Sequence, residues 1–148
     1  MKYFRIEEFK CKCGCAMPVE VKANIEALVA EVLDPVREAY GKPIYVNSGY
    51  RCEAHNRKVG GVLRSQHLVG EAADIRPVQS SRFKVQGDGS KSELEALARI
   101  IKEQGRFDQL IIYPTFLHVS YKRTGGNRHR TLRKIATGYA PVSHREIG

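Results

Sequence analysis

Three residues of the chain have the types and the setting needed to hold a catalytic metal ion. His67 and Asp74 lie in a largely apolar stretch where neither type is common, and Gly70 between them permits a sharp turn. Strand-like alternation over residues 117–121 places His118 on the face opposite its apolar neighbours. Two imidazoles and one carboxylate suit zinc and leave a fourth position for water, which zinc can ionise near neutral pH for attack on a peptide carbonyl. Spacing alone does not show that His118 lies near His67 and Asp74. A single His in a strand is more often a hydrogen-bonded structural residue than a metal ligand.

Hydrophobic periodicity and turn residues predict the helices and strands around these three residues. Apolar side chains on one helical face predict a helix over residues 19–40, which Pro35 should kink or divide. A capping-box pattern at Ser92 predicts a second helix that ends at Gly105. We also expect a short helical segment at 53–58, strands at 44–48, 72–76, 109–113 and 117–121, and a mobile surface loop at 77–91 that rims the site. The order predicts an α+β single domain whose helices pack on a small, mostly antiparallel sheet carrying the metal site.

Charge divides the chain into a body and a basic end. The net charge is +9, and residues 122–148 hold seven Lys or Arg and one Glu, which leaves +3 for the body. We therefore expect a domain at 1–122 that carries the metal site and a basic C-terminal tail at 123–148. Such a tail suits an anionic wall polymer, although a solvated tail without a partner is an equal alternative. Nucleic acid is a weaker interpretation, because no aromatic platform or recognised motif accompanies the charge.

Four cysteines form a second group of possible ligands. Cys11, Cys13 and Cys15 alternate with single residues, and Cys52 stands alone. This spacing differs from that of common zinc fingers, and without a secretory signal stable disulfides are not the default. Free structural thiols are the first interpretation, and a second metal site or a disulfide to Cys52 are the alternatives.

The ordered motifs of the chain resemble a known family. The run Ser65-x-His67-x-x-Gly70-x-Ala72-x-Asp74, followed far downstream by His118, resembles the zinc D-alanyl-D-alanine carboxypeptidases. That family includes phage L-alanyl-D-glutamate endopeptidases and vancomycin-resistance dipeptidases, and the hedgehog signalling domain shares its metal fold. The similarity runs from about Tyr3 to Lys122. Two further segments, Phe107-Asp108-Gln109-Leu110-Ile111 and His118-Val119-Ser120, resemble the phage and prophage branch of the family. The other matching segments are Ser48-Gly49-Tyr50-Arg51, His55-Asn56 and Val59-Gly60-Gly61.

This resemblance implies roles for particular residues. The zinc ligands would be His67, Asp74 and His118. Arg51 would bind a substrate carboxylate or stabilise the oxyanion, because a guanidinium matches planar anions. Without the resemblance, a surface Arg paired with Glu53 or solvent would be the simpler interpretation.

The chain departs from the family pattern at one position. Many members carry an acid three residues before the last His as general base, and here that residue is Thr115, which cannot accept a proton at neutral pH. Tyr113 resembles the Tyr of the murein endopeptidase branch, and we expect it to stabilise the oxyanion. Glu71 and Asp108 are other carboxylates that could act as the base.

Together these observations predict a zinc metallopeptidase that hydrolyses stem peptides of bacterial peptidoglycan as a carboxypeptidase or an endopeptidase. The alternative is a catalytically inactive zinc-binding domain that docks on wall polymer or a protein partner. No membrane span or signal peptide is recognisable, so we expect a monomer that is cytoplasmic as synthesised and acts on the wall when another factor releases it. A phage or prophage lysis enzyme, released by a separate membrane pore, would meet that condition.

Overall fold

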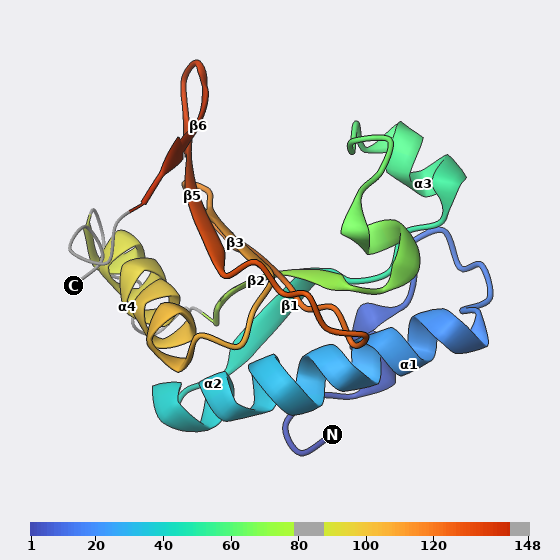
Figure 1. Ribbon diagram of the computed structural model, residues 1–148, viewed down its shortest axis with the longest axis horizontal. Coiled ribbons are helices and arrows are strands. Elements are labelled where there is room, and N and C mark those ends of the chain that lie inside the picture. Colours follow the sequence, from blue (N-terminus) through green and yellow to red (C-terminus); the bar gives the residue numbers. More distant parts are fainter. Residues whose placement is uncertain (79–87, 143–148) are drawn as a thin grey trace.

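The computed structural model describes residues 1–78 and 88–142, and its helices lie mainly against one face of a sheet (Figure 1). The helical elements are η1 (Ile6–Phe9), α1 (Val19–Leu28), η2 (Val29–Leu33), α2 (Asp34–Tyr40), α3 (Glu53–Lys58), η3 (Gln66–Val69) and α4 (Asp88–Gln104). The strands are β1 (Ile44–Ser48), β2 (Ala72–Pro77), β3 (Gln109–Ile112), β4 (Leu117–Ser120), β5 (Arg130–Ile135) and β6 (Gly138–Pro141). The predicted α+β class with a mostly antiparallel sheet is confirmed.

The six strands form one sheet in the order β1-β2-β4-β3-β5-β6. All neighbouring pairs are antiparallel except β3 and β5, which are parallel. The central pair of β2 and β4 sets Asp74 directly opposite His118. Two of the predicted metal ligands are therefore cross-strand neighbours on one face.

The other face of the sheet is covered by α1, α2 and α4 (Figure 1). Strand alternation directs the fully buried side chains of Ile75, Leu110 and Leu117 toward these helices. They join one core with the helical residues Ile25, Leu28, Leu33, Leu97 and Ile101. The core fixes the register of the sheet, and with it the face on which Asp74 and His118 project.

The helix predicted over residues 19–40 is continuous, and its irregular part lies just before Pro35. The π-helical turn η2 joins α1 to α2 with right-handed helical dihedral angles at both junctions, and Pro35 follows it as the second residue of α2. The helix ends at Gly41, whose φ of 76° is left-handed.

Two other segments differ from expectation. The helix α4 begins at Asp88, four residues before the predicted start at Ser92, so the capping-box pattern at Ser92 does not mark its end. The predicted mobile loop at 77–91 falls largely on residues 79–87, which lie outside the described residues. Pro77 itself belongs to β2.

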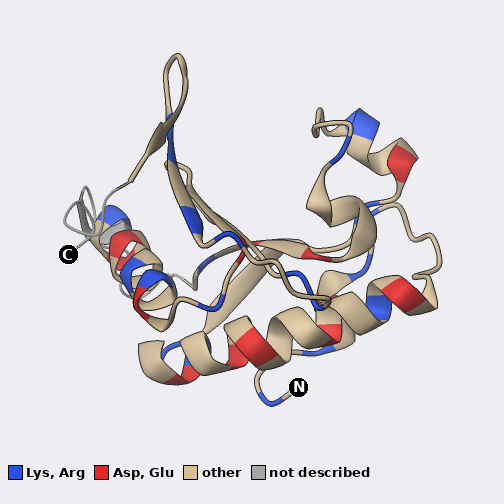
Figure 2. Ribbon diagram, viewed as in Figure 1, with Lys and Arg blue, Asp and Glu red and all other residues tan. Residues whose placement is uncertain are grey.

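Residues 123–148, which we predicted as a basic tail, contribute the strands β5 and β6. Thr131 and Leu132 in β5 are buried, and β5 pairs with β3 over four positions, from Gln109↔Arg130 to Ile112↔Arg133. Residues 121–142 contain no Asp or Glu, so all charged residues of this part are basic, whereas α1 and α4 carry charges of both signs (Figure 2).

Within the described part of the chain, none of the helices has the length and apolar character that crossing a bilayer requires.

Candidate metal centre

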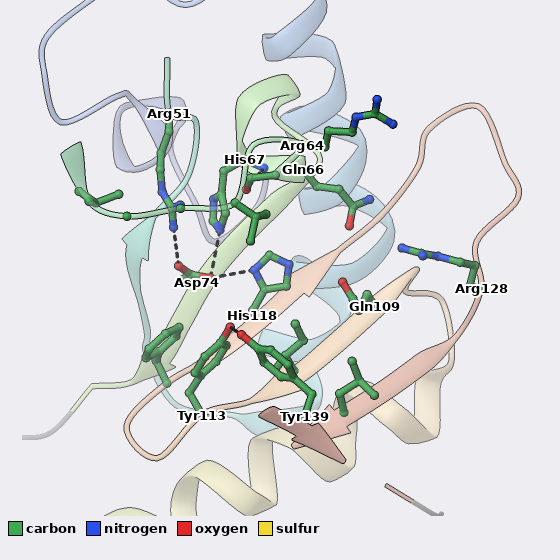
Figure 3. A pocket seen from close by; sticks show the side chains of 18 residues that line it. Arg51, Arg64, Gln66, His67, Asp74, Gln109, Tyr113, His118, Arg128 and Tyr139 are labelled. Atoms are coloured by element: carbon green, nitrogen blue, oxygen red, sulfur yellow. Dashed lines mark hydrogen bonds and ion pairs between the residues drawn. The ribbon is translucent and has the colours of Figure 1, made fainter. Parts of the chain in front are cut away.

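The structure brings His67, Asp74 and His118 together on the open face of the sheet (Figure 3). Asp74 Oδ1 lies 3.1 Å from His67 Nε2 and 3.0 Å from His118 Nδ1. Donor atoms around a tetrahedral zinc with bonds of about 2.0–2.1 Å would be about 3.3 Å apart. The three atoms are therefore spaced as ligands of one small cation.

The hydrogen bonds of His67 favour a metal at this point. Its Nδ1 lies 2.6 Å from the carbonyl oxygen of Gly49, which can only accept, so Nδ1 carries the proton. In a neutral imidazole Nε2 then has a lone pair, and that lone pair faces the carboxylate oxygen of Asp74. A metal ion between these two atoms would be held by both of them, and a backbone carbonyl that accepts from the other ring nitrogen commonly orients a ligating His.

His67 is held by the short helix η3 and the turn that ends it. Ser65 caps η3 by accepting a hydrogen bond from the His67 amide at 3.1 Å. Gly70 ends it with a φ of 76°, and a Cβ there would lie 2.6 Å from the Val21 carbonyl oxygen of α1. Only glycine meets both conditions, so the turn between His67 and Asp74 depends on Gly70 as predicted.

Asp74 contacts both histidines and Arg51. Burial alone would raise its pKa, but the contacts with the imidazoles of His118 and His67 outweigh burial and hold the pKa of Asp74 well below its usual range. Burial lowers the pKa of His118, which the Asp74 contact only partly offsets. Asp74 is thus ionised and His118 favours its neutral form, as metal ligation requires.

Arg51 extends the site on the far side of Asp74. Its guanidinium donates to Asp74 Oδ2, Ser48 Oγ and Asn56 Oδ1, each at 3.1 Å, and its side chain is only 13% exposed. Gly61 leaves room for this arrangement, because a Cβ there would lie 2.1 Å from Asn56 Oδ1 and 2.8 Å from Arg51 Nη1. Arg51 is therefore built into the metal centre, and the alternative of a surface Arg paired with Glu53 or solvent is not the arrangement found.

Tyr113 lies at the end of β3, and its hydroxyl group is 3.2 Å from that of Tyr139 in β6. Its ring stacks on Phe116 with centroids 4.5 Å apart. Burial, followed by the contact with Tyr139, raises the pKa of Tyr113 above its ordinary value. The phenol therefore keeps its proton and remains a hydrogen-bond donor beside the metal site (Figure 3).

The two carboxylates that we considered as bases are engaged elsewhere. Asp108 is fully buried and accepts from Arg128 Nε and Nη2 at 3.0 and 2.8 Å and from Gln66 at 3.0 Å. Although burial opposes it, this pairing lowers the pKa of Asp108 to about 2. Glu71 contacts Gln66 at 3.3 Å, and Thr115 is exposed in the turn between β3 and β4. Among the described residues, Asp74 is the only carboxylate that lines the pocket.

The pocket around the metal site has a volume of about 530 Å³ and a cationic lining. Besides Arg51 it exposes Arg64 and Arg128, and Ile111, Phe116 and Leu132 supply apolar surface. Sequence analysis missed Arg64, Arg128 and Tyr139 as lining residues. Arg128 and Tyr139 lie beyond the similarity that ends near Lys122, whereas the position of Arg64 one residue before the Ser65 motif was an available signal.

Comparison with known proteins places the chain in a family. A family model described as Peptidase M15 matches residues 2–120, so the chain belongs to the peptidase M15 family. Over 44 residues it is 48% identical to a zinc D-Ala-D-Ala carboxypeptidase of Streptomyces albus G. That match covers 29% of this chain and 17% of the relative, so the chain spans only a small part of the relative's length. The resemblance to this family is confirmed, and the assignment to its phage and prophage branch stays a prediction.

The contacts of Arg51 lead to a first expected result. Replacing Arg51 by Lys keeps the charge but removes the fork that holds Asp74, Ser48 and Asn56 at once, so the orientation of Asp74 should relax. Loss of such outer-shell support typically costs about 10- to 100-fold in activity or metal affinity. We expect kcat/KM on a stem peptide to fall by that factor in zinc-saturated Arg51→Lys protein.

The matched control is Arg76→Lys, since Arg76 lies two residues after Asp74 in β2 and donates to Asn47. It should retain nearly full activity. Equal activity in both variants would mean that Arg51 has no part in the reaction.

Proposed function

We propose that this protein is a zinc peptidase that hydrolyses peptide bonds in the stem peptides of bacterial peptidoglycan. The observation that carries the proposal is the set of His67, Asp74 and His118, whose donor atoms meet at one point that opens into a cationic pocket. Membership of the peptidase M15 family and the match to a zinc carboxypeptidase support it.

The donor set fits zinc better than other common ions. Two imidazole nitrogens and one carboxylate oxygen are typical of catalytic zinc, which keeps a fourth position open, whereas magnesium and calcium prefer oxygen ligands. Zinc bound there would supply a Lewis acid and a water molecule whose pKa is lowered to about 7. The Gly49 carbonyl holds Nδ1 of His67 and leaves Nε2 facing the site, and Asp74 is ionised, as ligation requires.

The protein's own groups would bind and orient the peptide. Arg51 holds Asp74 and faces the pocket, so its remaining N–H groups are available to a substrate oxygen. Tyr113 offers a protonated hydroxyl to negative charge that develops on the carbonyl oxygen. Arg64 and Arg128 line the same pocket, and the carboxylates of stem peptides are natural partners for them.

The proposal covers the position of the cleaved bond and the biological role of the enzyme. Cleavage at the carboxyl end and cleavage within the stem peptide both remain compatible with the pocket. The motif resemblance to phage and prophage endopeptidases favours a lysis enzyme that reaches the wall after a separate pore opens the membrane.

The alternative of a catalytically inactive, zinc-binding domain rests on one specific observation. Thr115 occupies the position where many members carry the base, and Asp74 is the only carboxylate among the described residues that line the pocket. Purified peptidoglycan incubated with zinc-loaded protein separates the two. New amino termini above a His67→Ala control support the peptidase, and their absence across several wall chemistries and pH values would favour the inactive domain.

The cationic rim leads to a second expected result. Arg64 is exposed and lines the pocket, so its loss should weaken encounter with an anionic peptide and leave the metal centre intact. An exposed ion pair contributes about 0.2–1 kcal/mol, which corresponds to a rise in KM of up to roughly fivefold for Arg64→Ala with little change in kcat. Steady-state kinetics at low and high salt measure it.

Arg57→Ala is the control, because Arg57 is also exposed but lies on α3 and is not among the lining residues. The difference in KM should shrink at high salt. An unchanged KM at low salt would show that Arg64 does not contact the substrate.

A further inference from the structure

A second cluster of possible ligands lies outside the pocket, where the loop between η1 and α1 meets the start of α3 (Figure 1). It consists of Cys11, Cys13, Cys15 and Cys52, whose Sγ atoms all lie within 4.8 Å of one another. Three of the separations are 3.3 Å (Cys11–Cys13), 3.5 Å (Cys13–Cys52) and 3.8 Å (Cys11–Cys52). Four sulfur atoms thus surround one point, although they come from segments 41 residues apart.

These separations are those of a metal–thiolate site. Four sulfurs at about 2.3 Å from a tetrahedral zinc are about 3.8 Å apart, close to the observed values. A disulfide would hold two sulfurs at about 2.05 Å and would leave the other two without a reason to converge. Free thiols are weak hydrogen-bond partners, so they offer little energy for collecting four side chains in one place.

The backbone around the cluster is shaped to present the sulfurs. Gly14 adopts a φ of 84°, and its amide donates to the Cys11 carbonyl at 3.0 Å, so the loop curls and its alternating cysteines share one side. The amide of Cys52 donates to Cys11 Sγ and the amide of His55 donates to Cys52 Sγ, each at 3.4 Å. Amide donors to sulfur stabilise the negative charge of thiolate ligands.

We propose that Cys11, Cys13, Cys15 and Cys52 bind a structural zinc ion, separate from the ion held by His67, Asp74 and His118. Four thiolates select zinc over harder divalent cations and leave no open position, so this ion supports the fold and does no chemistry. The spacing differs from that of zinc fingers because the ligands come from a curled loop and a distant residue, where a finger uses two short-range pairs.

The site would tie the N-terminal segment to the back of the catalytic centre. Cys52 directly follows Arg51, and the adjoining amide of Tyr50 donates to the Phe9 carbonyl at 2.8 Å. The backbone of Gly49 packs so tightly on Phe9 that a Cβ on Gly49 would come within 2.6 Å of the Phe9 Cα atom. The carbonyl oxygen of Gly49 accepts a hydrogen bond from His67. A metal at the cluster therefore fixes the strand end that carries both Arg51 and the acceptor for His67.

Metal counting on the full-length protein, purified under reducing conditions, tests this inference. We expect two zinc ions per chain in the wild type and one in the double variant Cys13→Ser/Cys15→Ser, chosen because both side chains are exposed and lie outside the core. His67→Ala should also hold one zinc ion. Lys12→Ser, in the same loop, should keep both and serves as the matched control.

Cobalt substitution identifies which site is lost. A thiolate-to-cobalt charge-transfer band should be present in the wild type and in His67→Ala, and absent from the cysteine double variant. This band does not depend on peptidase activity, so it separates failure of this inference from failure of the proposed function. Four thiols that react freely in zinc-saturated protein, or a mass showing disulfides in place of metal, would overturn the assignment.

Discussion

Replacing Asp74 by Ala is expected to remove the zinc ion of the pocket and to reduce peptidase activity to background. Asp74 Oδ1 is shared by His67 and His118, and Oδ2 is held by Arg51, so one substitution removes the centre of the whole arrangement. His67→Ala and His118→Ala should have the same effect on zinc and activity, because each removes one of three protein ligands. Elemental analysis and kinetics on the same preparations measure both quantities.

The Asp74 variant should also lose stability. Without Asp74, the largely buried guanidinium of Arg51 has no charged partner, and breaking such a pair typically costs about 3–5 kcal/mol. Asp74→Asn keeps an oxygen for Arg51 and should recover part of that stability while still lacking the charge that zinc requires. His129→Ala is the control for the histidines, since His129 is exposed on the loop before β5. Full zinc content at the pocket in any of the three ligand variants would contradict the assignment.

Replacing Tyr113 by Phe is expected to lower kcat by about 10²–10³-fold, the usual cost of losing one donor to an oxyanion. KM and zinc content should change little, because the ring can still stack on Phe116 and no metal ligand is touched. The raised pKa of Tyr113 means that the hydroxyl keeps its proton through the neutral range, so the effect should be nearly constant between pH 6 and pH 8.

Tyr139→Phe is the matched control for Tyr113. It removes the hydroxyl group in β6 that lies 3.2 Å from that of Tyr113, and should have a much smaller effect. If the two variants behave alike, the tyrosine pair acts as a structural contact and Tyr113 has no part in stabilising the oxyanion.

Much of the site could be predicted because its determinants are local. Alternation placed Leu117 and Val119 in the core and His118 on the opposite face, and the structure has this arrangement. Gly70 indicated the turn between His67 and Asp74, and its left-handed φ and close contact with α1 confirm that turn. That these residues meet depends on the register of β2 against β4, which follows from packing between segments far apart in the sequence.

The parts that sequence analysis missed lack a periodic signal. The strand β5 contains three basic residues, and only Thr131 and Leu132 are buried, so its sequence has the composition of a solvated tail. The strand β6 is four residues long, with Gly at its start and Pro at its end. The strand β5 pairs with the edge of β3, and β6 pairs in turn with β5, a tertiary effect that single-residue propensities do not contain.

The cysteine cluster also depends on tertiary contacts that sequence patterns do not contain. Sequence spacing left free thiols, a metal and a disulfide as alternatives for Cys11, Cys13, Cys15 and Cys52. The structure adds that all four sulfurs converge, which depends on how the end of η1 packs against Gly49 and Tyr50, between β1 and α3. A sequence motif does not show which residues far apart in the chain lie close together in space.

The most direct test of the central proposal is mass spectrometry of a synthetic stem peptide incubated with the protein before and after removal of metal. Zinc-loaded protein should yield two fragments whose summed mass exceeds that of the substrate by one water molecule. Chelation should stop the reaction and added zinc should restore it, whereas Asp74→Ala should be inactive under every condition. Intact peptide after prolonged incubation with protein shown to hold zinc at His67, Asp74 and His118 would contradict the proposed peptidase activity.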